Sequence, residues 1–296
     1  MVKIKIPATS ANLGPGFDAL GLALKMYNEV HMQETEGCDI ASLDDTVIPT
    51  GKDNMIYINA KHLYNFCGRP FYGMKIRQIN NIPMTRGLGS SSACIIGGLL
   101  GANALLGNPL QRQDILTLAA DMEGHPDNIA PALLGGLVTS VMEDNKVWSI
   151  SVPVSDNMRF AALIPDFEMS TEQARKILPH SVTRREAVFN LSRTALMTAA
   201  LFSGELDCLK IAVDDKLHQP KRLELIPGGK DAMEICYELG AYGVYLSGAG
   251  PTIMAIIDSN AQDFAPIAKI MLEERGIYGW SIIMLDCDQE GAKFID

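Results

Sequence analysis

Hydrophobic and polar positions alternate at the start of the chain, where Val2–Ile6 reads apolar, polar, apolar, and Met74–Ile79 follows a similar pattern. A two-residue period is typical of a half-buried β-strand. Between Asn54 and about Phe66, apolar residues instead recur every three or four positions. Because an Asn side chain accepts hydrogen bonds from the first N–H groups of a helix, this segment predicts a helix that Asn54 caps.

The rest of the pattern predicts short strands mixed with helices. Further strands are expected at Ala19–Met32, Leu137–Met142, Val147–Val152, Arg159–Ile164, Gly243–Leu246, Thr252–Ile257 and Trp280–Leu285. Further helices are expected at Ser90–Leu106, Leu110–Met122, Ser170–Leu178, Arg184–Phe202, Glu205–Val213, Gly229–Leu239 and Ala261–Glu274. This order favours an α+β fold in two domains, residues 1–155 and residues 156–296.

Composition narrows the class of protein. Of the 296 residues, 47% are hydrophobic and 20% are charged, as in soluble globular proteins. A net charge of −10 argues against a nucleic-acid partner, which requires a basic face. The N-terminus lacks the apolar segment of a signal peptide, and the run Ala93–Gly107 is too short to span a membrane. We therefore expect a cytoplasmic protein whose six scattered cysteines are reduced.

One glycine- and serine-rich segment, PMTRGLGSSSA, runs directly into a predicted helix. Its glycines let the backbone approach a ligand closely, and the N–H groups at a helix start favour an anion. Its serine hydroxyls can bind phosphate oxygens or Mg²⁺, and its arginine adds positive charge. The candidate phosphate-binding residues are Pro83, Met84, Thr85, Arg86, Gly87, Leu88, Gly89, Ser90, Ser91, Ser92 and Ala93.

The same segment has a simpler interpretation as a glycine turn in which a serine caps an ordinary helix. Two better-known phosphate motifs do not fit it. The chain has no G-x-x-x-x-G-K-[ST] loop, and a dinucleotide fingerprint would need glycine where Ser92 stands. Taken alone, the segment indicates an anion site at a helix start.

Two further motifs change that interpretation. PATSANLGPGFD (Pro7–Asp18) lies near the N-terminus and LSGAGPT (Leu246–Thr252) near the C-terminus. With the phosphate segment Pro83–Ala93, they resemble in order and spacing the motifs of the GHMP kinases, over essentially the whole chain. The resemblance implies a two-domain fold, with a ribosomal-protein-S5-like α/β domain followed by a ferredoxin-like α+β domain. It also implies ATP and Mg²⁺ as cofactors, and it is compatible with a homodimer.

The sequences SANLGPGFD and EGHPDNIAPA (Glu123–Ala132) resemble the form of these motifs in the branch of that family that phosphorylates L-homoserine. In that branch Glu123 and a loop serine, with Ser91 the first choice, would bind Mg²⁺. Asn128 and Thr171 would line the reacting centre. Without this context, a glutamate at a helix end is ordinarily a solvated surface residue.

Homoserine carries an ammonium, a carboxylate and a hydroxyl, and each requires a partner. The resemblance assigns the ammonium to Asp18 and the carboxylate to Arg175 and Arg222, since a guanidinium binds a carboxylate with two hydrogen bonds. Asn12 and Asn128 would orient the side chain and its hydroxyl. Each arginine taken singly is more typical of a solvated surface.

A general base is not evident. Asp127 is a candidate by its chemistry, whereas the homoserine-type pattern places the amide of Asn128 at the equivalent position, and an amide does not accept a proton effectively. We therefore expect alignment and electrostatic stabilisation to carry catalysis. The alternatives are a GHMP-type kinase for a mevalonate-like substrate and a non-catalytic nucleotide-binding protein of the same fold.

Overall fold

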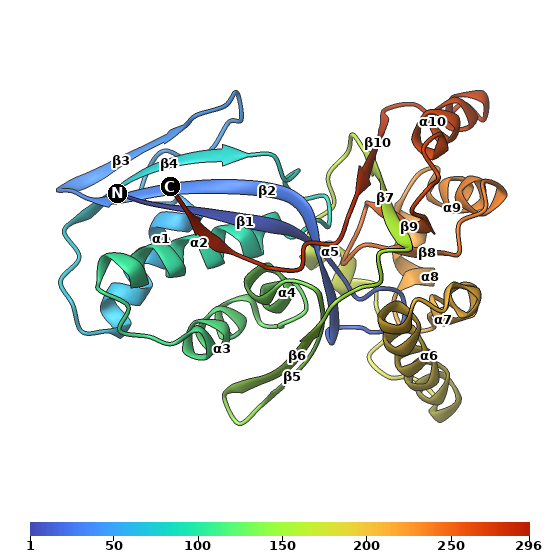
Figure 1. Cartoon of the computed structure of the whole chain (residues 1–296), viewed down its shortest axis with the longest axis horizontal. Coiled ribbons are helices and arrows are strands. Elements are labelled where there is room, and N and C mark those ends of the chain that lie inside the picture. The colour runs from blue at the N-terminus through green and yellow to red at the C-terminus, as the bar shows by residue number, and fades with distance from the viewer.

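The computed structural model describes residues 1–296 and contains two β-sheets, each covered by helices (Figure 1). The first sheet has the strand order β11-β1-β2-β4-β3, and β5 extends it by pairing with both β2 and β6. All of these pairings are antiparallel except that of β3 with β4. The strands are β1 (Val2–Ala11), β2 (Leu20–Glu34), β3 (Gly37–Ser42), β4 (Gly73–Asn80), β5 (Leu137–Glu143), β6 (Lys146–Val152) and β11 (Lys293–Ile295).

Four helices lie on one face of this sheet (Figure 1): α1 (Met55–Phe66), α2 (Ser90–Leu105), α3 (Arg112–Glu123) and α4 (Ile129–Leu134). Helix α2 lies between the sheet and α1, and its glycines permit the close approach. A Cβ atom at Gly101 would lie 2.1 Å from the sulfur of Met32 in β2, and one at Gly98 would lie 2.7 Å from the carbonyl oxygen of Ile56 in α1. This packing fixes where the N-terminus of α2 points.

Asn54 caps α1 as predicted. Its side chain accepts hydrogen bonds from the backbone N–H groups of Ile56 and Tyr57. The apolar positions of the helix, Ile56 and Leu63 among them, are buried against the core. The three-to-four-residue period therefore identified the correct face.

The second sheet has the order β10-β7-β9-β8 and is antiparallel throughout. Its strands are β7 (Met158–Pro165), β8 (Gly243–Leu246), β9 (Ile253–Asp258) and β10 (Trp280–Leu285). Its helical elements are α5 (Thr171–Lys176), α6 (Arg184–Ser203), η1 (Leu206–Cys208), α7 (Leu209–Ala212), α8 (Gln219–Arg222), η2 (Leu223–Leu225), α9 (Gly229–Glu238) and α10 (Phe264–Glu274). None of the helices combines the length and apolar composition needed to cross a membrane.

One apolar cluster joins the two sheets, and a second, smaller cluster lies within the second half of the chain. The larger cluster includes Ile4 and Leu22 of the first sheet together with Phe160 and Met254 of the second. After β10 the chain crosses back, so that β11 pairs with β1 and the two termini lie side by side (Figure 1). The chain passes from the first sheet to the second between β6 and β7, which is compatible with the proposed domain boundary near residue 155.

The mixed α+β class is confirmed, but several elements differ from the sequence prediction. The segment Glu205–Val213 is not one helix: a 3₁₀ turn, η1, precedes the short α7. The last helix begins at Phe264 rather than Ala261, because a turn occupies the residues before it. Pairing with distant strands, rather than local pattern, creates β3 and β11, neither of which was predicted.

Candidate active site

A cavity of about 390 Å³ lies where the three glycine motifs meet. The predicted site residues that line it are Asn12, Asp18, Met84, Thr85, Arg86, Gly87, Leu88, Gly89, Ser90, Ser91, Ser92, Glu123, Asn128, Thr171, Arg175 and Arg222. Pro83 and Ala93, at the two ends of the phosphate segment, do not line it, and Ala93 is packed in the core instead. Side chains from positions 12 to 222 thus face one space.

Within the phosphate segment, the loop before α2 ends in a left-handed glycine, Gly89, which is the N-cap of α2 and has a φ of 74°. No side chain caps this helix, so the alternative of a serine cap is wrong. The first N–H groups of a helix have no partner within it, and here they open onto the cavity. A Cβ atom at Gly89 would lie 1.9 Å from the hydroxyl oxygen of Thr9, which explains the glycine.

Contacts with distant strands hold the loop. The Ser247 hydroxyl donates to the carbonyl oxygen of Gly87 at 2.6 Å, and the Thr9 N–H donates to that of Leu88 at 3.1 Å. Arg86 donates to the carbonyl oxygens of Pro165 and Asp166. The guanidinium predicted to attract phosphate therefore ties the loop to the second sheet.

The two predicted metal-binding residues lie together. Ser91 donates to one carboxylate oxygen of Glu123 at 3.2 Å, and Ser92 donates to the other at 3.3 Å. Burial raises the pKa of Glu123, and the opposing effects of His125 and of the two serine hydroxyls do not cancel it. This half-buried set consists of hard oxygen atoms beside a helix N-terminus, as Mg²⁺ requires.

The three residues predicted to bind the charged groups of the substrate, Asp18, Arg175 and Arg222, all line the cavity. Two of them are paired with each other. Arg175 donates two hydrogen bonds to the Asp18 carboxylate, at 2.7 and 3.1 Å. Arg222 is 1% exposed and has no carboxylate within ion-pair distance. Burial, and then the charge of Arg175, lower the pKa of Arg222 to about 10. The cavity therefore contains a buried cation that lacks an anion.

The side chain of Asn12 makes its hydrogen bonds within the chain. Its side-chain nitrogen donates to the carbonyl oxygen of Gly248 at 2.9 Å, and its side-chain oxygen accepts from the Asp18 N–H at 3.0 Å. The residue joins the first motif to the third and positions the backbone that carries Asp18. A direct contact of Asn12 with substrate stays a prediction.

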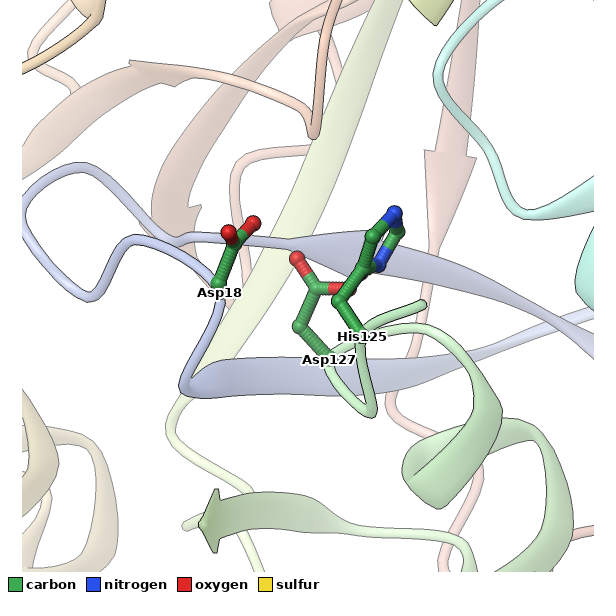
Figure 2. A group of neighbouring side chains, drawn as sticks. All are labelled: Asp18, His125 and Asp127. Atoms are coloured by element: carbon green, nitrogen blue, oxygen red, sulfur yellow. Dashed lines mark hydrogen bonds and ion pairs between the residues drawn. The ribbon is translucent and has the colours of Figure 1, made fainter. Parts of the chain in front are cut away.

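Asn128 stands beside a buried carboxylate. Thr9 donates to its amide oxygen at 2.7 Å, so its nitrogen faces Asp127. His125 Nδ1 lies 2.6 Å from Asp127, and Figure 2 shows the Asp127 carboxylate between His125 and Asp18. Burial acts to lower the pKa of His125, but the bond and charge of Asp127 outweigh it and raise that pKa. Asp127 therefore already has a hydrogen-bonding partner in His125.

Several lining residues carried no motif and were missed. They are Ile48, Pro49, Asp53, Gln78, Asn80, Cys94 and Met169, all of which reach the cavity through tertiary packing. Asn54 and Met55, at the start of α1, also line the cavity.

Comparison with known proteins bears on this geometry. The family model "GHMP kinases N terminal domain" matches residues 54–136, and "GHMP kinases C terminal" matches residues 197–273. The chain is 43% identical to a homoserine kinase of Clostridium beijerinckii, over 100% of this chain and 99% of that protein. This chain is a member of the GHMP kinase family. A homoserine kinase of Caldicellulosiruptor saccharolyticus is 45% identical over 99% of this GHMP kinase and 96% of its own length.

Solved structures agree in fold. A crystal structure of homoserine kinase from Cytophaga hutchinsonii superposes on this GHMP kinase with a TM-score of 0.86, at 30% identity, over 99% of this chain and 97% of that one. A mevalonate kinase from L. major superposes with a TM-score of 0.72 at 14% identity, over 97% and 96% of the two chains, which shows the shared fold alone. The predicted two-domain GHMP kinase fold is confirmed.

Proposed function

We propose that this GHMP kinase is a homoserine kinase. It transfers the γ-phosphoryl group of ATP to the side-chain hydroxyl of L-homoserine, giving O-phospho-L-homoserine and ADP on the route to threonine. The observation that carries the proposal is the buried Arg222, a cation without an anion, beside the Asp18–Arg175 pair in the cavity that holds the phosphate loop. A zwitterionic amino acid supplies the missing carboxylate.

The charged groups fit the substrate without large rearrangement. A carboxylate oxygen has two lone pairs, so Asp18 can accept from the substrate ammonium while it keeps its bonds to Arg175. The substrate carboxylate then faces Arg222, and Arg175 lies close enough to Arg222 to affect its pKa. The free-energy cost of transferring the carboxylate from water into this site is offset by its attraction to the fixed positive charge.

The phosphate groups of ATP belong at the start of α2. The backbone N–H groups after Gly89 and the hydroxyl groups of Ser90 and Ser91 line the cavity there. Their partial positive charge is fixed in place by packing, so it stabilises negative charge without reorganisation. The apolar and amide side chains of Pro49, Met55 and Gln78 form another part of the same cavity wall and are proposed to contact the base.

Mg²⁺ fits the oxygen set formed by Glu123, Ser91 and Ser92. When bound, it neutralises phosphate charge and orients the transferred group. The serine hydroxyls already touch the carboxylate, so the three side chains are held in position before any ligand enters. Ser91 remains the first choice for the hydroxyl ligand, and Ser92, at a similar distance from Glu123, is a second candidate.

The reacting hydroxyl is proposed to lie against Asn128 and Thr171. The Thr171 hydroxyl makes no hydrogen bond within the chain, and the Asn128 nitrogen is a donor because Thr9 occupies its oxygen. Neither group accepts a proton at neutral pH, and His125 engages Asp127. Rate enhancement then comes from alignment of the hydroxyl and from electrostatic stabilisation at α2, with little general-base catalysis.

Measurement of ADP release with L-homoserine, mevalonate and galactose as acceptors tests the function. We expect turnover with homoserine to exceed that with the other two by orders of magnitude. Equal turnover would reassign the substrate within the family. Binding of ATP without turnover of any acceptor would support the non-catalytic alternative.

A cytoplasmic location and a homodimer complete the proposal. Light scattering at several protein concentrations measures the mass in solution directly. A mass of one 32.1 kDa chain at all concentrations would contradict the dimer.

A further inference from the structure

The hydrogen bonds of Arg222 account for three of its five N–H groups. Nε donates to the carbonyl oxygen of Ala174 at 3.1 Å, and Nη1 donates to that of Gly248 at 3.0 Å. The second Nη1 hydrogen points to Nδ1 of His218 at 3.2 Å. Nη2 makes no hydrogen bond within the chain, so it remains available to a ligand in the cavity that Arg222 lines.

The tautomer of His218 follows from its two neighbours. Its Nε2 lies 2.7 Å from the carbonyl oxygen of Gly14, which can only accept, so Nε2 carries the proton. In the neutral ring Nδ1 is then an acceptor, and the arginine that faces it can only donate. Gly14 and Arg222 both favour the neutral ring with its proton on Nε2, and together they fix the orientation of the ring.

Asp215 does not convert this histidine into a cation. Its carboxylate lies 3.7 Å from Nε2, but each of its oxygens already accepts two N–H groups. Those donors are the backbone N–H groups of Leu217, His218 and Gln219 and the side-chain nitrogen of Asn190. Burial, reinforced by the charge of Arg222, outweighs Asp215 and Asp18 and lowers the pKa of His218.

The imidazole therefore connects two parts of the substrate site. Gly14 belongs to the loop that carries Asp18, whereas Arg222 lies in α8 of the second half of the chain. Phe17, in the same loop, lies 5.2 Å from the His218 ring and 5.3 Å from the Arg222 guanidinium, measured from its ring centre. His218 has no exposed surface and cannot itself contact substrate.

We propose that His218 is a positioning residue for the homoserine kinase reaction: its neutral ring holds Arg222 at a fixed distance from the Asp18 loop, so that Nη2 meets the substrate carboxylate. The inference rests on the proposed function. It assigns to His218 the spacing between the two sites that bind the charged groups of an amino acid, and hence selectivity for an acceptor that carries a carboxylate.

Two substitutions distinguish the hydrogen bond that His218 makes with Arg222 from the one that it makes with Gly14. In His218→Asn, the amide oxygen can replace Nδ1 as the acceptor for Arg222. In His218→Gln, the amide nitrogen can replace Nε2 as the donor to Gly14, and the acceptor for Arg222 is lost. His62→Gln, at an exposed position of α1, is the matched control.

Each variant is assayed with L-homoserine and with 3-aminopropan-1-ol, which keeps the ammonium and hydroxyl but lacks the carboxylate. The ratio of the two kcat/KM values reports the contribution of the carboxylate, and any unfolded fraction cancels because it lowers both values equally. We expect His218→Gln to reduce this ratio about tenfold or more, mainly through the KM for homoserine. His218→Asn should stay within about threefold of the wild type.

Equal losses on both acceptors in His218→Gln, or equal ratios in the two His218 variants, would overturn the inference and leave a structural role only. The wild-type enzyme separates this outcome from failure of the proposed function. If the wild type does not turn over homoserine, the function itself is wrong, irrespective of the variants.

Discussion

At the scale of a single residue, the carboxylate of Glu123 is placed where its charge is only partly stabilised. Glu123 is half-buried, and its only hydrogen-bond partners are the hydroxyl groups of Ser91 and Ser92. Two neutral hydroxyls do not fully offset the loss of water around a charge. A bound cation would offset it, which is why the residue indicates a metal site.

Replacement of this carboxylate by an amide should therefore affect the metal first. We expect Glu123→Gln to raise the Mg²⁺ concentration for half-maximal velocity at least about tenfold and to lower kcat. Initial rates over a Mg²⁺ titration measure both effects. Glu274→Gln is the control, since Glu274 also ends its helix but is exposed. An unchanged Mg²⁺ titration curve would remove Glu123 from the metal site.

The same residue predicts a pH dependence of stability in the absence of Mg²⁺. Burial raises the pKa of Glu123 above 4.5, so the folded chain binds this proton more tightly than the unfolded chain. The associated stability is fully present below pH 4.5 and is lost as the pH rises through the folded-state pKa. The urea midpoint of Glu123→Gln relative to wild type should accordingly increase from pH 4.5 to pH 8. A constant difference would contradict the prediction.

At the scale of elements, helix α2 decides the position of the proposed phosphate site. Left-handed glycines stand near both of its ends, Gly89 with a φ of 74° and Gly107 with a φ of 82°. They differ in their surroundings. A Cβ atom at Gly89 would collide with Thr9, whereas one at Gly107 would meet nothing within 4 Å.

This contrast permits a matched test. Gly107→Ala and Gly89→Ala both place alanine in a left-handed conformation, which costs about 1–2 kcal/mol. Only Gly89→Ala must also displace the Thr9 side chain, which holds Asn128. We expect Gly89→Ala to lower kcat/KM at least about hundredfold and Gly107→Ala to change it less than threefold. Steady-state kinetics and denaturation curves check this, and equal kinetic losses would refute it.

At the scale of the whole molecule, the cavity lies between the two halves of the chain. The phosphate loop and Glu123 come from the first half, whereas Thr171, Arg175 and Arg222 come from the second. Contacts such as Ser247 with Gly87 and Asn12 with Gly248 already connect these halves. Ligands that bind the folded chain should stabilise both parts together.

Thermal unfolding tests this coupling. Homoserine at a hundred times its Kd should stabilise wild type by about 2.7 kcal/mol, which is on the order of 5 °C in Tm. In Arg222→Leu a tenfold weaker affinity would about halve the stabilisation, while the shift produced by ATP alone stays unchanged. A loss of the ATP shift instead would show that Arg222 belongs to the nucleotide site.

The sequence predicted local features best where a local cause exists. Asn54 and the period after it located α1, because a cap and an amphipathic face depend on neighbouring residues. The short strand β11 was missed because its partner, β1, lies almost a chain length away. The contacts of Arg86 could not be predicted, since the carbonyl oxygens that it binds belong to a distant strand and to the residue after that strand.

The sequence by itself determined the family and the chemistry available to it: glycines at a helix start, serines after them, and an acid with two arginines for an amino acid. Only the tertiary structure decided how those groups are used. It paired Asp18 with Arg175, left Arg222 without an anion, and placed His218 between Arg222 and Gly14. These arrangements depend on burial and on donors and acceptors from distant segments, and no local pattern along the chain encodes which of them meet.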